Sequence, residues 1–168
     1  MASVLKWHTK NSTIIDVDLP ETLSHAILYI GSLFPNAKIL MPNEIEITTD
    51  LNSYDFVCLT PKQRNFFAES SVDLAINTHS FQEMTHIQID EYFKLIQRVG
   101  KVDSIFFTSN RVEKLPSGEG SFDKETAVLP NRFSDYPWSE KNEVKVFEVC
   151  KLFRLVQLDS IFNRLEVI

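Results

Sequence analysis

The stretch Val72–Met84 (VDLAINTHSFQEM) holds the side chains of this chain that are best suited to chemistry. An unbroken apolar run ends there in a cluster of small polar and ionisable residues that includes His79 and Glu83. Since an imidazole with an unperturbed pKa of about 6.5 accepts a proton near neutral pH, we predict His79 as a general base. Glu83 would orient it or serve as the base itself. The alternative is structural: His79 hydrogen-bonds a turn, and Glu83 caps the next helix.

A metal site is a second chemistry that the same stretch suggests. His79, Glu83 and His86 follow one another at intervals of four and three, which on a helix places them on one face. The pattern is not His-Glu-x-x-His, and the segment is expected to pass from loop to helix partway, so we predict no metal. Cys58 and Cys150 are the only cysteines, too few for a thiolate site. Both lie in apolar, strand-like stretches, where buried reduced thiols are expected.

Two predicted strand ends would position the polar residues. Val72–Ile76 is continuously apolar apart from Asp73, which suits a strand buried on both faces of a parallel sheet. Ligands of open α/β sheets bind beyond the carboxyl ends of such strands, where Asn77 and Thr78 follow. A second strand, predicted over 13–17, ends at Asp18, whose carboxylate could accept the hydroxyls of a ribose. The alternative for Asp18 is an N-terminal helix cap.

The remaining pattern predicts one α/β domain over residues 1–168 with a largely parallel sheet. Pro20 suits the first position of a helix that ends near Pro35, and a second apolar helix face lies between residues 89 and 99, with Gly100 as its stop. Further strands are predicted at 37–41, 54–59 and 102–108, with a polar edge segment at 44–50 and two strands after 143. Residues 114–142, rich in proline and glycine, are predicted to form a loop or lid.

Composition excludes several partners. The formal net charge is −6 and the basic residues are dispersed, which argues against nucleic-acid binding. No apolar stretch has the length of a membrane span, and the N-terminus has no signal-peptide pattern, so we expect a cytoplasmic protein.

Three stretches together resemble a known family. They are TIIDVDLPETLSHAILYIGSLFP (Thr13–Pro35), VDLAINTHSFQEMTHIQIDEYFKLI (Val72–Ile96) and VDSIFFTSN (Val102–Asn110). In this order they resemble the later part of a class I S-adenosylmethionine-dependent methyltransferase, specifically the sugar O-methyltransferases of bacterial surface-polysaccharide loci. The middle stretch, with its Asn-Thr-x-Ser-x-x-Glu-Met element, is the most specific.

The resemblance implies a fold, a cofactor and a set of roles. The fold would be Rossmann-like, with a mostly parallel sheet and helices on both faces. S-adenosylmethionine would be the methyl donor and a sugar hydroxyl the acceptor, with His79 and Glu83 as catalytic residues. The implied cofactor contacts are Asp18, Leu19, Asn77 and Thr78, and the implied acceptor contacts are Asn110, Tyr136 and Trp138. The alternative for Tyr136 and Trp138 is that they anchor their loop to the core.

The chain departs from the family at its start. The family's first strand and glycine-rich loop should precede residue 12, whereas the eleven preceding residues contain no glycine. The resemblance therefore predicts a fold that is incomplete at the N-terminus, with the missing loop supplied by an upstream segment or a second polypeptide. A homodimer would hide the sheet edge that this leaves exposed. The alternative is a catalytically inactive methyltransferase-like fragment that acts as a binding domain. A receiver-type signalling domain is excluded, because the buried strand ends in Asn77-Thr78 and not in an aspartate.

Overall fold

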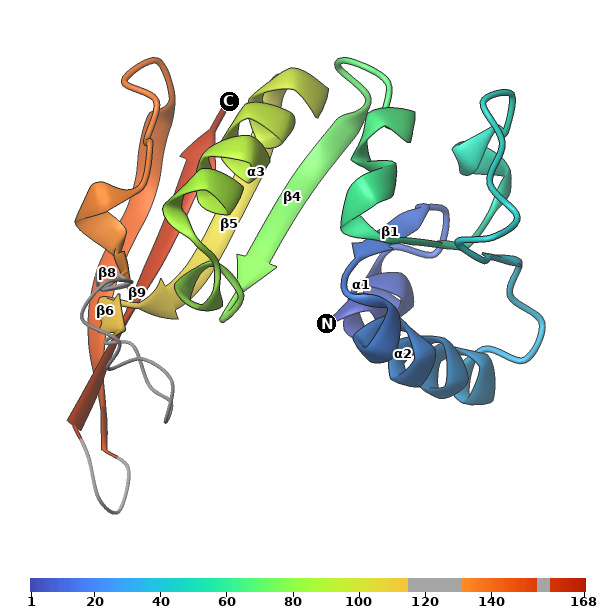
Figure 1. Cartoon of the computed structure of the whole chain (residues 1–168), viewed down its shortest axis with the longest axis horizontal. Helices are drawn as coiled ribbons and strands as arrows, with labels where there is room; N and C mark the ends of the chain where they lie inside the picture. The colour runs from blue at the N-terminus through green and yellow to red at the C-terminus, as the bar shows by residue number, and fades with distance from the viewer. Residues whose placement is uncertain (115–130, 154–157) are drawn as a thin grey trace, which may run out of the picture. The chain divides into compact units, whose positions relative to one another are not determined.

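The computed structural model of the chain describes residues 1–114, 131–153 and 158–168, and the side chains of these residues outside 151–160. It divides into two compact units, Met1–Phe67 and Ala68–Ile168, which are described separately (Figure 1). The single domain predicted over residues 1–168 therefore stays a prediction. Most of the predicted loop at 114–142 lies outside the described residues.

The first unit contains a three-stranded parallel sheet. Its order is β1 (Ile14–Val17), β3 (Phe56–Leu59) and β2 (Ile39–Leu40), so the central strand β3 pairs on both sides and is buried along its whole length. Two α-helices belong to this unit, α1 (Ala2–His8) and α2 (Pro20–Leu33). As predicted, β1 leads directly into α2, which begins at a proline because its missing N–H costs nothing in the first turn.

Two short 3-10 helices, Leu51–Ser53 and Pro61–Phe66, complete the first unit. The prediction of a polar edge segment at 44–50 was wrong, since these residues form turns and no strand. Alternation of polar and apolar residues alone does not make a strand without a neighbour to pair with. Here Asp50 instead accepts a hydrogen bond from Asn52 N (3.1 Å) and caps the first 3-10 helix.

The second unit contains a four-stranded mixed sheet in the order β4 (Val72–Thr78), β5 (Gly100–Arg111), β9 (Leu158–Val167) and β8 (Glu143–Phe153). β4 and β5 are parallel, whereas β9 is antiparallel to both β5 and β8. The prediction of a mostly parallel sheet therefore describes the first unit and the β4–β5 pair only. Antiparallel neighbours need no crossover helix, and α3 (His86–Val99) is the only α-helix in the described part of this unit.

α3 has the apolar face predicted over residues 89–99, and it packs against one face of this sheet. Thr85 and Gln88 form a reciprocal capping box at its start, and Ile89 and Phe93 point into the core. Gly100 ends the helix, but not through a left-handed conformation, since its φ is −61°. A Cβ atom at Gly100 would lie 2.7 Å from Ser104 Oγ, a side chain of the same strand, so a larger residue at this position would have to displace it.

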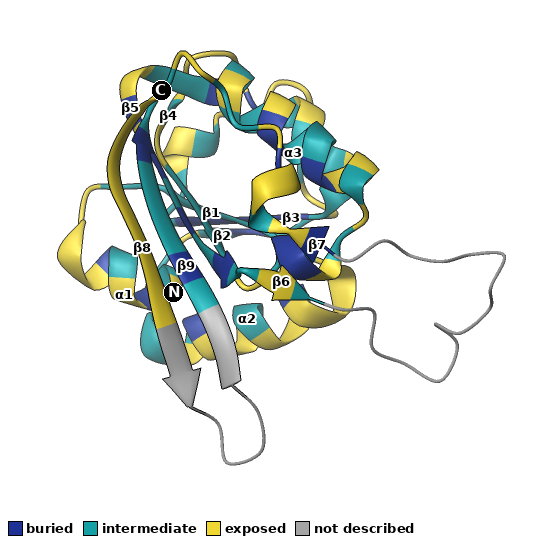
Figure 2. Cartoon of the chain, turned by 90° about the vertical axis from the view of Figure 1, so that its left-hand side faces the viewer, coloured by how far each residue is buried: buried dark blue, intermediate teal, exposed yellow. Residues whose placement is uncertain are grey.

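The core of the second unit is aromatic. Its buried members come from α3, β5, β9 and the loops: Phe81, Ile89, Phe93, Phe106, Tyr136 and Phe162. The sheet is unevenly covered, and Figure 2 shows β8 exposed along its described side chains while β9 contains buried positions. The prediction that β4 is buried on both faces was wrong, because Leu74 is 43% exposed and β4 pairs only with β5 in the described sheet. Cys58 is buried as predicted, whereas Cys150 is exposed.

Candidate functional site

The turn that follows β4 is built around Asn77. Its Oδ1 accepts a hydrogen bond from Phe81 N (3.4 Å), and its Nδ2 donates to Ser80 Oγ (2.5 Å). The Phe81 ring is almost fully buried in the aromatic core, which fixes the far end of the turn. Asn77 is therefore engaged in local structure through Oδ1 and one of its two Nδ2 hydrogens.

The parallel neighbour β5 holds the same turn from the side. Asn110, fully buried near the end of β5, donates through Nδ2 to Asn77 Oδ1 and to Thr108 Oγ1, both at 2.9 Å. His79 N donates to Ser109 O (2.8 Å), so the turn also continues the backbone pairing of the two strands. The register sets this arrangement, since Asn77 lies opposite Thr108 in the β4–β5 ladder.

His79 is presented to solvent at the tip of this turn. Its side chain is exposed, and its backbone adopts the left-handed conformation (φ 57°), one of three positive φ values at non-glycine residues in the described chain. A left-handed conformation costs a non-glycine residue about 1–2 kcal/mol. Strain of this kind is commonly retained where function requires it. His79 thus has the exposure that a general base needs.

Glu83 lies in an ion pair, not in a catalytic dyad. Its carboxylate accepts a hydrogen bond from Gln82 Nε2 (3.1 Å) and pairs with Lys114 Nζ. The Lys114 ammonium, followed by the Gln82 amide, holds the pKa of Glu83 below its ordinary value despite the opposing effect of burial. A carboxylate stabilised in this way is a weaker base, so the geometry favours His79 over Glu83 in that role.

A second set of contacts ties the end of β5 and the short strand β7 (Asn131–Arg132) to the same region. Gln82 Oε1 accepts from Arg111 N (2.9 Å), and Asn131 Nδ2 donates to Gln82 O (3.2 Å) and Met84 O (2.6 Å). Gln82 and Asn131 are both buried. Sequence reasoning missed Lys114 and Asn131, because each meets its partner across more than 30 residues of chain.

In the first unit, Asp18 lies at the carboxyl end of β1. Its Oδ1 accepts from Leu19 N (2.7 Å), and the N-cap of α2 is Leu19, which makes no side-chain cap. The helix-cap alternative for Asp18 is therefore wrong, and its second carboxylate oxygen has no partner among the described residues. Burial, followed by the negative charge of Asp18, raises the pKa of Asp16.

Tyr136 and Trp138 anchor their loop to the core. Tyr136 is 4% exposed and packs edge-on against Phe81 (5.8 Å between centroids), so it has no free face for stacking. Trp138 donates from Nε1 to Phe133 O (2.7 Å), and the Arg164 guanidinium covers its ring at 4.2 Å. Of the two alternatives for these aromatic residues, the anchoring role accounts for both positions.

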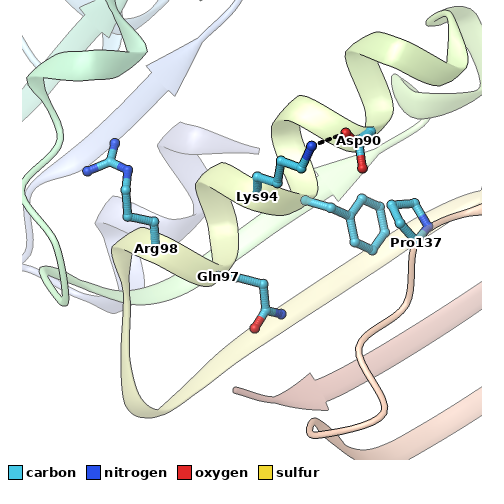
Figure 3. A pocket seen from close by; sticks show the side chains of 6 residues that line it. Asp90, Lys94, Gln97, Arg98 and Pro137 are labelled. Atoms are coloured by element: carbon cyan, nitrogen blue, oxygen red, sulfur yellow. Dashed lines mark hydrogen bonds and ion pairs between the residues drawn. The ribbon is translucent and has the colours of Figure 1, made fainter.

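An open surface depression of about 500 Å³ lies beside α3 (Figure 3). It is lined by Asp90, Phe93, Lys94, Gln97, Arg98 and Pro137. None of the predicted catalytic or cofactor residues contributes to it. In the described ranges no group of three or more His, Cys, Asp or Glu side chains is arranged to hold a metal ion. Nor does a helix in those ranges have the length and apolarity needed to cross a membrane.

Comparison with known proteins supports the fold alone. No protein-family model matches the chain, and no curated protein matches it. Among solved structures, the PH0226 protein from Pyrococcus horikoshii OT3 is similar with a TM-score of 0.56 and 13% identity, over 98% of this chain and 76% of that one. The chain therefore has the mixed α/β fold of that protein.

Two further solved structures are similar at lower scores, too low to add to the argument. One is a structure described for the conversion of a disulfide bond into a thioacetal group during echinomycin biosynthesis (TM-score 0.49, 12% identity, 99% of this chain and 80% of that one). The other is a LepI variant in complex with SAH and a substrate analogue (TM-score 0.44, 14% identity, 94% of this chain and 43% of that one).

Proposed function

We propose that the chain is a cytoplasmic S-adenosylmethionine-dependent O-methyltransferase that acts on a sugar hydroxyl. The observation that carries the proposal is the turn after β4, which presents an exposed His79 in a strained conformation at the carboxyl ends of two parallel strands. Ligands of α/β sheets bind at such ends. The sugar acceptor rests on the sequence resemblance of Val72–Ile96.

The residues that would hold the cofactor fit it in part. The free carboxylate oxygen of Asp18 suits a ribose hydroxyl, and the exposed side chain of Leu19 suits an apolar contact beside it. Thr78, half-buried at the end of β4, has a hydroxyl without a partner among the described contacts and could donate to the ligand. Asn77 holds the turn through Oδ1 and one Nδ2 hydrogen, and its second Nδ2 hydrogen would donate to the ligand. When bound, the cofactor supplies an electrophilic methyl group.

His79 would supply the proton acceptor. A sugar hydroxyl is a poor nucleophile, and its proton must leave as the oxygen attacks, so an exposed imidazole at the strand end would take that proton at Nδ1 or Nε2. Asn110 is proposed as an acceptor-site residue through its position behind the turn, since it is fully buried and contacts Asn77. Tyr136 and Trp138 would shape the acceptor site from the core.

Calorimetric titration of the chain with S-adenosylhomocysteine tests the cofactor site. Hydrogen bonds to a charged group contribute about 1.5–3 kcal/mol, so Asp18→Ala should weaken binding roughly 10- to 100-fold. The matched control is Asp50→Ala, which removes a carboxylate of the same unit with the same kind of local backbone bond and should leave affinity unchanged. Equal losses in both variants would refute the assignment of Asp18.

Methyl transfer to a panel of sugars and nucleotide sugars then tests the reaction. Losing a general base typically costs 10²–10⁴-fold in rate, so His79→Ala should lower turnover by about 100-fold or more with cofactor affinity unchanged. If the folded chain binds no S-adenosylhomocysteine, the alternative takes its place: a methyltransferase-like binding domain. That alternative is favoured by one feature, because neither β1 nor β4 is followed by a glycine-rich turn.

A further inference from the structure

The buried amide of Asn110 has only one orientation that satisfies its neighbours. Asn77 Oδ1 accepts the backbone N–H of Phe81, and Asn77 Nδ2 donates to Ser80 Oγ, which fixes which atom of Asn77 faces β5. Asn110 must therefore present its donor, Nδ2, to Asn77 Oδ1. The same Nδ2 also donates to Thr108 Oγ1.

This orientation leaves Asn110 Oδ1 buried without a hydrogen-bond partner. A buried unsatisfied acceptor costs about 1–3 kcal/mol, and an apolar side chain would avoid that cost. Natural sequences keep such locally unfavourable choices chiefly at functional sites. The cost is incurred at a side chain that reaches across from β5 to the turn carrying His79.

We propose that Asn110 is a positioning residue that acts through Asn77 to hold His79 in its left-handed conformation at the end of β4. Asn110 does not contact the imidazole. It holds Asn77 Oδ1 in place, and this oxygen accepts the hydrogen bond from Phe81 N just after His79. On the other side, His79 N donates to Ser109 O, so the backbone is held both at His79 and after it. The relevance of this to catalysis rests on the proposed function, whereas the positioning itself can be measured without it.

The direction of the hydrogen bond gives an asymmetric test. Asn110→Asp replaces the donor with an oxygen that repels Asn77 Oδ1, so the turn should loosen. Asn77→Asp keeps the acceptor for both Phe81 N and Asn110 Nδ2, and the Ser80 hydroxyl can reverse to become the donor, so the turn should stay in place. The same chemical change is thus expected to have opposite results at the two ends of one hydrogen bond.

The readout is NMR of the full chain without ligand. In Asn110→Asp the amide protons of His79 and Phe81 should exchange at least about tenfold faster than in the parent, and the His79 imidazole signals should shift. In Asn77→Asp both should stay close to the parent values. If Asn110→Asp does not fold, Asn110→Ala removes the same donor without adding a charge and leaves the bonds of Asn77 to Phe81 N and Ser80 Oγ in place, and it should give the same loss of protection.

Asn131→Ala is the matched control. Asn131 is a buried amide that likewise donates two hydrogen bonds through Nδ2 and leaves Oδ1 unpaired, but its partners are Gln82 O and Met84 O. It should lower the melting temperature without shifting the His79 signals. Equal effects of the two Asn-to-Asp exchanges, or unchanged protection in Asn110→Asp, would overturn the proposal. Failure of the proposed function would instead show as absent S-adenosylhomocysteine binding with this asymmetry intact.

Discussion

Replacing His79 with glycine should stabilise the protein while removing its activity. At φ 57° a non-glycine side chain costs about 1–2 kcal/mol, and glycine avoids this cost but loses about 0.5–1 kcal/mol through the greater freedom of its unfolded chain. The net gain in the free energy of unfolding is about 1 kcal/mol or slightly less. For a chain of 168 residues this raises the melting temperature by about 2–4 °C.

His79→Ala separates the backbone effect from loss of the imidazole. Alanine keeps the Cβ atom and hence the strain, so its melting temperature should stay within about 1 °C of the parent, although it also lacks the proposed base. Asp103→Gly is the control for stability alone, because Asp103 is exposed and has the same conformation (φ 65°). The Asp103→Gly variant should show the same rise in melting temperature as His79→Gly, with an unchanged rate of methyl transfer. A His79→Gly variant no more stable than His79→Ala would refute the reasoning from strain.

Three other substitutions test the packing and electrostatics. The Tyr136 hydroxyl is buried without a partner, and this burial raises the pKa of Tyr136 to about 12. Tyr136→Phe should therefore raise the free energy of unfolding by about 1 kcal/mol, measured by thermal unfolding. A decrease of that size would mean that the hydroxyl has a partner. Asp16→Asn should stabilise the chain at pH 7, because the raised pKa of Asp16 makes its ionised form unfavourable in the folded state. The extra stability of Asp16→Asn should shrink as the pH falls toward 3.8, the ordinary pKa of an aspartate. If this extra stability does not depend on pH, the pKa of Asp16 is not raised. Gly100→Ala should lower the free energy of unfolding by about 1–3 kcal/mol through the contact with Ser104 Oγ. In the double variant, Ser104→Ala should restore part of this loss. If the effects of the two substitutions on the free energy of unfolding simply add, the contact is excluded.

The order of most elements, and the limits of a few, could be predicted from the sequence. The strand before Asp18, the helix from Pro20 and the helix face over residues 89–99 all depend on interactions within a few residues, namely apolar spacing, a proline at the first helical position and a capping box. The same local reasoning identified the turn after β4 as the place where polar side chains gather. It also placed His79 there, although its role as a base remains a proposal.

The tertiary structure decided which of those side chains meet. Asn110 reaches Asn77 across 33 positions and Asn131 reaches Gln82 across 49, and these pairs follow from sheet register and loop packing, which no local spacing encodes. The same holds for Tyr136, whose surroundings come from four separate elements, and for β9, whose antiparallel direction depends on its neighbours. The sequence therefore determined the polar turn and its strand, because both arise from neighbouring residues. Only the fold determined that Glu83 is paired, that Asn77 is held in place and that His79 is exposed.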